Sequence, residues 1–455
     1  MKTFSRGIRV KHNKKKTEEK NLQEAIIPNH VIIPLQQSLG CPCDPIVKVG
    51  DEVKEGQKIG DSSKFVFAPV HASISGKVTK IEWQPNACGF DAASITIESS
   101  ELRAESRENT EHRTQSTEHG SQNLENLTPD DIRKIVKEAG IVGLGGATFP
   151  THVKLSPPKD KKIDTVIVNG CECEPFITID HRLMLERTED MIFGAQAVAK
   201  AVGASKIIIG VEKNKLNAIE KLKAVISNWK TCPELVEGLE ISILDTKYPQ
   251  GGEKMLIKAI LEREVPSGGL PMDVGVIVNN VGTCIAITEA IKLGKPLISR
   301  AVTVTGSGIR EPKNLYVRIG TTFKDVIDQC GGLTDDAAKI IMGGPMTGLP
   351  VSSLDVPVVK GTSCILVLNK KDAKAFSEGD CIRCGRCIKV CPTGLMPNFI
   401  ADYIKLKDWE RVEEYNVKDC IECGCCSYVC PSRIYLVQYF KLGKRELQTR
   451  KAVCK

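Results

Sequence analysis

CIRCGRCIKVCP, at residues 381–392, and CIECGCCSYVCP, at residues 420–431, share the spacing C-x2-C-x2-C-x3-C-P. In this pattern three cysteines on a tight loop reach three irons of one cubane, and the fourth, at the start of a helix, reaches the other cluster. The two stretches therefore predict a bacterial ferredoxin-like domain with two [4Fe–4S] clusters. A pair of zinc knuckles is the alternative. It is disfavoured because three closely spaced cysteines, followed by a fourth cysteine and a proline, occur twice.

Because the fourth cysteine of each motif reaches the cluster of the other motif, the ligands of both clusters can be assigned. The first cluster is predicted to be held by Cys381, Cys384, Cys387 and Cys430. The second is predicted to be held by Cys391, Cys420, Cys423 and Cys426. Cys425 is surplus to the pattern, and we expect it to be a small neighbour of the second cluster rather than a ligand.

Composition places the chain among soluble multidomain proteins. Its 455 residues are too many for one typical core, and no run of 18 apolar residues predicts a membrane span. The 19 cysteines occur without an N-terminal signal pattern, which favours metal or redox chemistry in a reducing compartment. The net charge of +7 owes much to basic runs at the ends, which predict solvated tails, with contact to anionic lipid or an acidic protein as the alternative. Nucleic-acid binding is disfavoured because these runs lack interleaved aromatic residues.

Short β-strands are predicted near the N-terminus, where VKVGDEVKEGQKIG and FAPVHASISGKVTKIE alternate apolar residues with glycines. These two stretches resemble the sequences of lipoyl and biotinyl barrel-sandwich domains. Lys64 lacks the flanking residues of a carrier lysine, so we expect a docking or structural module. The following polar stretch contains His112 and His119 and is predicted to be a linker.

A mostly parallel α/β sheet is predicted next, from apolar strands at DTVIV, KIIIGV, LEISIL and VGVIVNN with helical stretches between them. Ligands of such sheets bind beyond the carboxyl ends of the strands, where NGCECEP, TKYPQGGEK and NNVGT follow. We expect the glycine loop GLGGATFP, residues 143–150, to form a wall of the same pocket, with its bare backbone close to a flat or phosphorylated ligand. The pattern of residues 298–367 predicts a small α+β unit of the β-grasp type.

Four segments in this order resemble the flavin-carrying, NADH-oxidising subunit of respiratory complex I: GLGGATFPTHVK, NGCECEP, YPQGGEK and NNVGT. The whole layout is still more similar to the RnfC family, the C subunits of Rnf electron-transport complexes, over about residues 25 to 440, and EVPSGGLP and DVPVVKGTS share that family's phrasing. The resemblance implies non-covalently bound FMN, NAD(H) as substrate and two clusters. It also implies a peripheral position on the cytoplasmic side of the cell membrane, other members of the Rnf complex as partners and ferredoxin as an indirect partner.

The resulting domain plan combines α/β and α+β units. It comprises a basic tail (1–22), a barrel-sandwich hybrid (23–99), a polar linker (100–127), an FMN/NAD(H)-binding α/β domain (128–297), a β-grasp domain (298–367), a two-cluster ferredoxin-like domain (368–440) and a basic tail (441–455).

Matching positions in the resemblance imply a set of ligand contacts. The positions implied for FMN are Gly143, Gly145, Gly146, Lys154, Asn169, Glu172, Tyr248, Gly251, Glu253, Asn279, Asn280 and Thr283. Those implied for the nicotinamide nucleotide are Phe149 and Glu174, with Glu174 as the candidate catalytic residue. Lysine suits a phosphate, asparagine the edge of the isoalloxazine, and phenylalanine a purine face.

Three departures accompany the resemblance. Leu144 stands where that pattern has arginine, Cys171 where it has aspartate, and Gly252 where it has glutamate. We interpret Cys171 and Cys173 as small loop residues, with a redox or ligand role as the alternative.

The implied activity is ferredoxin:NAD+ oxidoreduction within an ion-translocating complex. The alternatives are a flavo-iron–sulfur reductase of a cobalamin or amino-acid reductase system, and a non-enzymatic relay protein with a degenerate flavin site.

Overall fold

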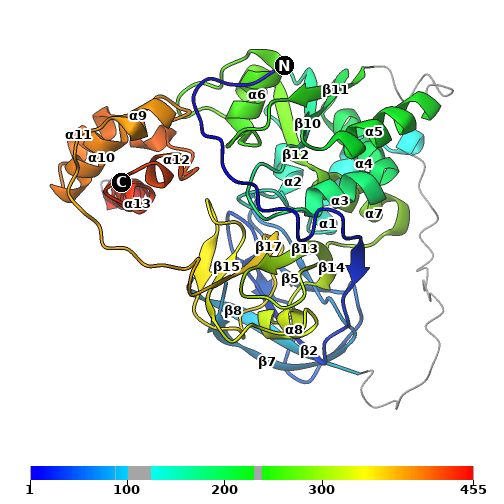
Figure 1. The fold of residues 1–455 in the computed structure, drawn as a ribbon. Helices are drawn as coiled ribbons and strands as arrows, with labels where there is room; N and C mark the ends of the chain where they lie inside the picture. The colour runs from blue at the N-terminus through cyan, green and yellow to red at the C-terminus, as the bar shows by residue number, and fades with distance from the viewer. Residues whose placement is uncertain (1, 88, 101–123, 230–237, 454–455) are drawn as a thin grey trace.

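The computed structural model describes residues 2–87, 89–100, 124–229 and 238–453. Figure 1 shows an α/β unit in cyan and green, two β-rich units in blue and yellow beside it, and a helical unit in orange and red. This multidomain arrangement confirms the predicted fold class. Most of the predicted linker, with His112 and His119, lies outside the described residues. In the described part of the chain, no helix is long and apolar enough to cross a membrane.

The α/β unit contains a parallel sheet of order β11-β10-β9-β12. Its strands are β9 (Thr165–Gly170), β10 (Lys206–Glu212), β11 (Leu239–Leu244) and β12 (Val276–Asn280). Its helices are α1 (Pro129–Glu138), α2 (Thr151–Lys154), α3 (Ile179–Glu186), α4 (Thr188–Val202), α5 (Leu216–Trp229), α6 (Glu253–Leu261) and α7 (Val281–Leu293), with 3-10 turns η2 (Leu124–Asn126) and η4 (Pro271–Val274).

Both faces of this sheet are covered, which explains why its strands are continuous runs of valine and isoleucine. In β9, Val166 and Val168 belong to one buried cluster and Ile167 to another on the opposite face. The predicted α/β alternation is therefore confirmed.

The barrel-sandwich unit consists of two small antiparallel sheets, of orders β2-β8-β7-β4 and β3-β5-β6. Its strands are β2 (His30–Pro34), β3 (Asp44–Pro45), β4 (Glu52–Val53), β5 (Lys58–Asp61), β6 (Val70–His71), β7 (Gly76–Pro85) and β8 (Asp91–Ser99). Alternating apolar residues of these strands, such as Ile95 and Ile97, fill the core between the sheets.

The β-grasp unit has one mixed sheet of order β1-β14-β13-β17-β15-β16. Its elements are β1 (Leu22–Glu24), β13 (Ser299–Gly306), β14 (Lys313–Arg318), α8 (Phe323–Asp328), β15 (Ala337–Met342), β16 (Leu349–Val351) and β17 (Cys364–Asn369). Strand β1 pairs with β14 in parallel, so the chain joins this sheet before it enters the barrel.

The ferredoxin-like unit is built from helices in the described residues. They are α9 (Arg386–Val390), α10 (Pro397–Lys405), α11 (Trp409–Glu414), η5 (Val417–Asp419), α12 (Cys425–Tyr428) and α13 (Leu436–Val453). The prediction of a solvated C-terminal tail is wrong for residues 441–453, which continue α13. Leu447 is buried in the core of the unit, and Lys444 donates from Nζ to the carbonyl of Cys420 at 2.6 Å.

The prediction of a solvated N-terminal tail is also wrong. Residues 2–22, which we call the N-terminal strap, run along the α/β unit toward the β-grasp sheet (Figure 1). Lys14 donates from Nζ to the carbonyl of Glu172, Lys16 to that of Gly306 and Lys20 to that of Pro312. These lysines are bound to the folded chain because they satisfy carbonyl groups at the ends of its elements.

Lys360 joins three units at one point. Its ammonium group is buried and donates to the carbonyls of Pro69 in the barrel, at 2.8 Å, and Gly140 after α1, at 2.7 Å. The backbone N–H of Lys360 donates to Gln37. These contacts fix the barrel against the α/β unit through a loop of the β-grasp unit.

Replacing Lys360 with methionine should destabilise this junction by about 1–3 kcal/mol, because two buried carbonyls lose their donor. Burial lowers the pKa of Lys360 to about 7, from 10.5. Between these values the unfolded chain binds a proton that the folded chain lacks, so the Lys360 contribution to stability rises with pH over that range.

The measurement is the melting temperature of wild type, Lys360→Met and the exposed control Lys223→Met. The gap between wild type and Lys360→Met should widen from about pH 7 to about pH 9.5. A difference in melting temperature that stays constant or narrows over this pH range would contradict the lowered pKa of Lys360.

Candidate functional site

Loops from distant parts of the α/β unit meet at the carboxyl edge of its sheet. Asn169, at the end of β9, donates from Nδ2 to the carbonyl of Gly251 at 2.8 Å. Lys154, on α2, donates from Nζ to Glu253 Oε1 at 3.2 Å and to the carbonyl of Val278 at 3.0 Å. The structure thus brings together four positions that the sequence implies for FMN.

The glycine loop forms an open cradle at this edge. Its base is closed by a hydrogen bond from the N–H of Gly143 to the carbonyl of Phe149, at 2.9 Å. A Cβ on Gly145 would lie 2.6 Å from Asn280 Nδ2, so the loop needs glycine there to approach β12. A Cβ on Gly146 would meet no atom within 4 Å. The backbone of the loop tip is therefore bare and faces open space, which fits a flat or phosphorylated ligand.

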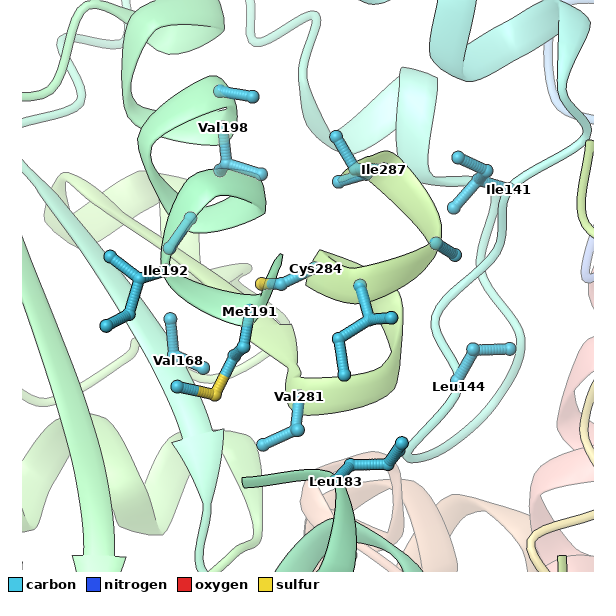
Figure 2. Close-up of a cluster of buried hydrophobic side chains, with 14 of the residues drawn as sticks. Ile141, Leu144, Val168, Leu183, Met191, Ile192, Val198, Val281, Cys284 and Ile287 are labelled. Atoms are coloured by element: carbon cyan, nitrogen blue, oxygen red, sulfur yellow. The ribbon is translucent and has the colours of Figure 1, made fainter. Parts of the chain in front are cut away.

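Leu144 belongs to the hydrophobic core rather than to the cradle. Its side chain is buried and packs against α7, where a Cβ on Gly282 would lie 3.3 Å from Leu144 Cδ1. Figure 2 shows Leu144 in the buried cluster that includes Val281. The N–H of Leu144 donates to Thr283 Oγ1 at 2.9 Å, which anchors the loop. Leucine at this position therefore holds the loop in place against α7.

A buried guanidinium group lies next to this loop. Arg300 donates from Nη1 to the carbonyl of Lys360 at 2.5 Å, and its Nη2 lies 3.5 Å from the carbonyl of Leu144. Burial lowers the pKa of Arg300 to about 10, and the charge of Asp180 opposes that shift. Arg300 and Asp180 line the same small cavity behind the glycine loop.

The two adjacent asparagines at the end of β12 have different surroundings. Asn280 donates from Nδ2 to Asp180 Oδ2 at 2.7 Å and accepts from the N–H of Gly282 at 2.8 Å, which caps α7. Asn279 is buried, and its Nδ2 has no hydrogen-bond partner within the described residues. A buried amide donor without a partner is costly, so Asn279 is the residue of the pair whose side chain fits a bound ligand.

Glu172 connects the site to the N-terminal strap. Its Oε1 accepts from the N–H of Asp180 at 2.6 Å, and its Oε2 lies 3.4 Å from Lys14 Nζ. Glu172 has φ of 45°, a left-handed conformation that is uncommon outside glycine. Burial raises the pKa of Asp180 to about 7, and the nearby Glu172 charge adds to that shift. The Glu172 side chain is thus engaged by the protein itself.

Glu174 contacts the β-grasp unit. Its Oε1 accepts from the N–H of Met346 at 2.7 Å and from that of Thr347 at 3.2 Å. Burial raises the pKa of Glu174, and these hydrogen bonds oppose the shift. Phe149 is partly buried at the end of the glycine loop. No contact of either side chain tests a nicotinamide role, so both assignments stay predictions.

Tyr248 connects the α/β unit with the second cysteine motif. Its hydroxyl donates to the carbonyl of Cys423 at 2.7 Å. It is buried in one cluster with Ile8 of the strap, Cys173 and Cys425. Tyr248 therefore lies between the flavin-side loops and the loop predicted to hold the second cluster.

Cys171 and Cys173 are buried thiols in this region. Burial raises the pKa of Cys173 to about 12, and it also raises that of Cys171. Cys173 Sγ accepts a hydrogen bond from the N–H of Gly251 at 3.3 Å. These surroundings favour protonated thiols that fill space in the loop. They favour the interpretation of Cys171 and Cys173 as small loop residues over a redox or ligand role.

The first cysteine set surrounds a cavity at the surface of the ferredoxin-like unit. That cavity is lined by Cys381, Cys384, Cys387 and Cys430, the four residues predicted for one cluster. Ile434 and Leu436 form its apolar wall. Cys384 is exposed, so this cavity lies at the solvent side of the unit.

The second cysteine set is more enclosed. Burial raises the pKa of Cys420 to about 12, with the neighbouring Cys423 and Cys391 contributing. Cys426 is buried. Burial raises its pKa, and the nearby Cys420, Cys423 and Cys391 add to that shift. The N–H of Glu422 donates to Cys420 Sγ at 3.3 Å, the kind of contact that stabilises a thiolate ligand.

Neither set converges on a point. In the part of the chain that the structure describes, no group of three or more His, Cys, Asp or Glu side chains is arranged to hold a metal ion. Four cysteines that bond four different irons surround a volume instead of sharing one ion. The cavity lined by the four cysteines of the first set is the kind of volume that a cubane cluster fills.

Three residues next to the site were missed from the sequence: the buried Lys14 and Arg300 and the half-buried Asp180. Lys14 lies in a basic run that is typical of a solvated tail, and Arg300 comes from the β-grasp sheet. Only Asp180 carried a signal, since it lies five residues after the motif NGCECEP.

Four family models match the chain in order. They are an RnfC barrel sandwich hybrid domain (residues 2–101), a Nuo51 FMN-binding domain (136–289), an SLBB domain (301–350) and a 4Fe-4S dicluster domain (374–431). The first match includes the N-terminal strap, in agreement with its ordered packing.

Curated relatives match over nearly the full length. The C subunit of the Na(+)-translocating ferredoxin:NAD(+) oxidoreductase complex of Acetobacterium woodii is 47% identical over 98% of this chain and 97% of its own. Its counterpart in the proton-translocating complex of Clostridium ljungdahlii is 46% identical, over 98% and 94%. Among solved structures, an NAD+-reducing [NiFe]-hydrogenase in the H2-reduced state is similar in fold, with a TM-score of 0.51, 20% identity and coverage of 72% of this chain and 61% of that one.

Proposed function

Because the chain belongs to the family of C subunits of ion-translocating ferredoxin:NAD+ oxidoreductase complexes, we propose that it exchanges electrons between NAD(H) and the rest of such a complex. The cofactors are FMN, held by the α/β unit, and two [4Fe–4S] clusters, held by the ferredoxin-like unit. When bound, FMN supplies two-electron exchange with a nicotinamide and one-electron exchange with iron–sulfur clusters.

The residues at the sheet edge form two groups: those that would contact the ligand, and a frame of residues that hold those contacts in position. The bare backbone at Gly145 and Gly146 gives close approach to a planar ring, and Asn279 supplies a buried amide donor. Lys154, now paired with Glu253, supplies a cation for the FMN phosphate or ribityl chain. The frame that orients these groups consists of Gly143, Asn169, Glu172, Tyr248, Gly251, Glu253, Asn280 and Thr283.

The observation that carries the proposal is the contact between Tyr248 and Cys423. One residue follows β11 in the α/β unit and the other belongs to the second cysteine motif, and a 2.7 Å hydrogen bond joins them. The second cysteine set therefore lies next to the flavin-side loops, and the first set lies toward solvent. This order suits transfer along the line from flavin to second cluster to first cluster.

The partners follow from the family. We propose that the chain binds other subunits of a membrane-bound complex, with ferredoxin as an indirect partner, and that it sits peripherally on the cytoplasmic side. Access to NAD(H) supports that side. The buried, well-packed Leu144 argues against the alternative of a relay protein with a degenerate flavin site. A role in a cobalamin or amino-acid reductase system is disfavoured by the curated relatives.

Substituting Lys154 tests the flavin assignment. Lys154→Met should weaken FMN binding about tenfold to a hundredfold, because a charge-assisted hydrogen bond contributes about 1.5–3 kcal/mol. Lys159→Met, at an exposed position five residues further on, is the control. The measurement is FMN titration by flavin fluorescence, followed by NADH-dependent dye reduction with the cluster absorbance recorded. Equal FMN affinity and equal turnover in all three proteins would overturn the assignment.

A further inference from the structure

The two cysteine motifs differ in charge although they share their spacing. The motif at 381–392 contains Arg383, Arg386 and Lys389 and no acidic residue. The motif at 420–431 contains one acidic residue and no basic one. Since the spacing alone sets cluster binding, this difference in charge needs another explanation.

The charged groups around the second motif are satisfied by this chain itself. Glu422 pairs with Lys444 at 2.8 Å, and Asp419, just before the motif, accepts from Ser267 Oγ at 2.6 Å. The carbonyl of Met346 lies against Gly424, where a Cβ would approach it to 2.9 Å. The second motif therefore faces the α/β and β-grasp units and is covered by them.

The basic groups of the first motif are left free. Arg383, Arg386 and Lys389 are exposed, and within the described residues none of them forms an ion pair. The side chain of Ile382 is 67% exposed beside them, and Cys384 is exposed as well. Three unpaired cations around an exposed apolar residue and an exposed cluster cysteine form a surface that we call the basic face.

We propose that the basic face docks an acidic surface of another electron-carrying subunit of the complex, and this inference rests on the proposed function. Positive charge on one partner and carboxylates on the other steer encounter and fix orientation. Exposed Ile382 gives an apolar centre to the contact, and exposed Cys384 brings the first cluster close to the partner's own cofactor. Anionic lipid is the competing occupant of a basic and apolar face, but a headgroup layer gives the exposed cluster no electron carrier to meet.

The test compares the complete chain, with its clusters reconstituted, in three forms. These are wild type, the triple variant Arg383→Glu/Arg386→Glu/Lys389→Glu, and the control Lys54→Glu/Lys221→Glu/Lys223→Glu, which reverses three exposed charges on the barrel and α5. The probes are the complex purified in detergent after removal of this subunit, and vesicles containing phosphatidylglycerol. Binding to each probe is measured at low and high salt.

The proposal predicts that the triple variant binds the depleted complex about tenfold or more weakly at low salt, and that raising salt weakens wild type but hardly changes the variant. The control should bind like wild type. Equal affinity of the triple variant and wild type for the depleted complex would overturn the proposal. So would a triple variant that loses vesicle binding and keeps complex binding, since the face would then contact lipid.

Iron content and NADH-dependent dye reduction are recorded for each form. Arg383 and Arg386 also line the cavity predicted for the first cluster, so Lys389→Glu, whose side chain does not line that cavity, is measured as a further variant. Lys389→Glu should keep the iron content and dye reduction of wild type and still bind the depleted complex more weakly at low salt. Absence of dye reduction in wild type would count against the proposed function, while the binding comparison would still decide the docking proposal.

Discussion

Cys426→Ala is expected to remove one of the two clusters, so that iron falls from about eight to about four atoms per chain. Electron delivery from NADH to the rest of the complex should then be abolished, because the second cysteine set lies between the flavin-side loops and the first set. Reduction of the flavin by NADH should persist, since its loops belong to the α/β unit. Iron analysis, electron paramagnetic resonance of the reduced protein and a rapid-mixing flavin assay measure the three quantities.

Cys425→Ala is the matched control for this experiment. It changes the same side chain on the adjacent residue of α12, and Cys425 is buried beside Tyr248 as the surplus cysteine of the motif. It should keep about eight irons and normal electron delivery. Equal iron loss in both variants, or full iron in Cys426→Ala, would contradict the assigned ligand set.

Gly146→Val should weaken FMN binding without unfolding the protein. A Cβ at Gly146 meets no atom of the chain within 4 Å, and its backbone does not have a positive φ, so the side chain is tolerated by the protein alone. The same side chain would occupy the space that the cradle leaves for a planar ligand. Overpacking costs of about 1–3 kcal/mol imply FMN binding about tenfold to a hundredfold weaker.

Gly379→Val provides the comparison. Gly379 also lacks a positive φ, and its Cβ would make ordinary contacts of 3.7 Å or more. We expect it to retain wild-type FMN affinity and wild-type melting temperature. Flavin fluorescence titration measures the affinities, and an unchanged affinity in Gly146→Val would show that the open face of the loop is not a flavin wall.

Patterns set by local spacing were predictable from the sequence. The four parallel strands were predicted because buried strands are continuous apolar runs, and the cavity lined by Cys381, Cys384, Cys387 and Cys430 follows from the spacing of their motifs. Convergence of the loops followed from the direction of parallel strands, which places their carboxyl ends at one edge.

Roles that depend on tertiary contacts were not predictable. Lys14 looks like a tail residue, and only the folded chain brings it to the carbonyl of Glu172. Tyr248 matches a flavin position, yet its hydroxyl donates to Cys423 in another unit. Adjacent asparagines look equivalent in NNVGT, and only hydrogen-bond partners distinguish Asn280, which is engaged, from Asn279, which is free to bind a ligand.

Position 144 shows how a departure from a pattern can mislead. Leucine stands where the resembling family pattern has arginine. The structure gives that side chain a place in the core against α7, while the buried guanidinium of Arg300 lies near the carbonyl of the same residue. A residue type is informative about a ligand only when its side chain faces the ligand.

Anaerobic titration of the reconstituted wild-type chain with NADH tests the central claim most directly. With about one FMN and two [4Fe–4S] clusters per chain, NADH should bleach the flavin absorbance and then produce the paramagnetic signals of reduced clusters. Full cluster content with no bound flavin, or bound flavin that NADH leaves oxidised, would contradict the account.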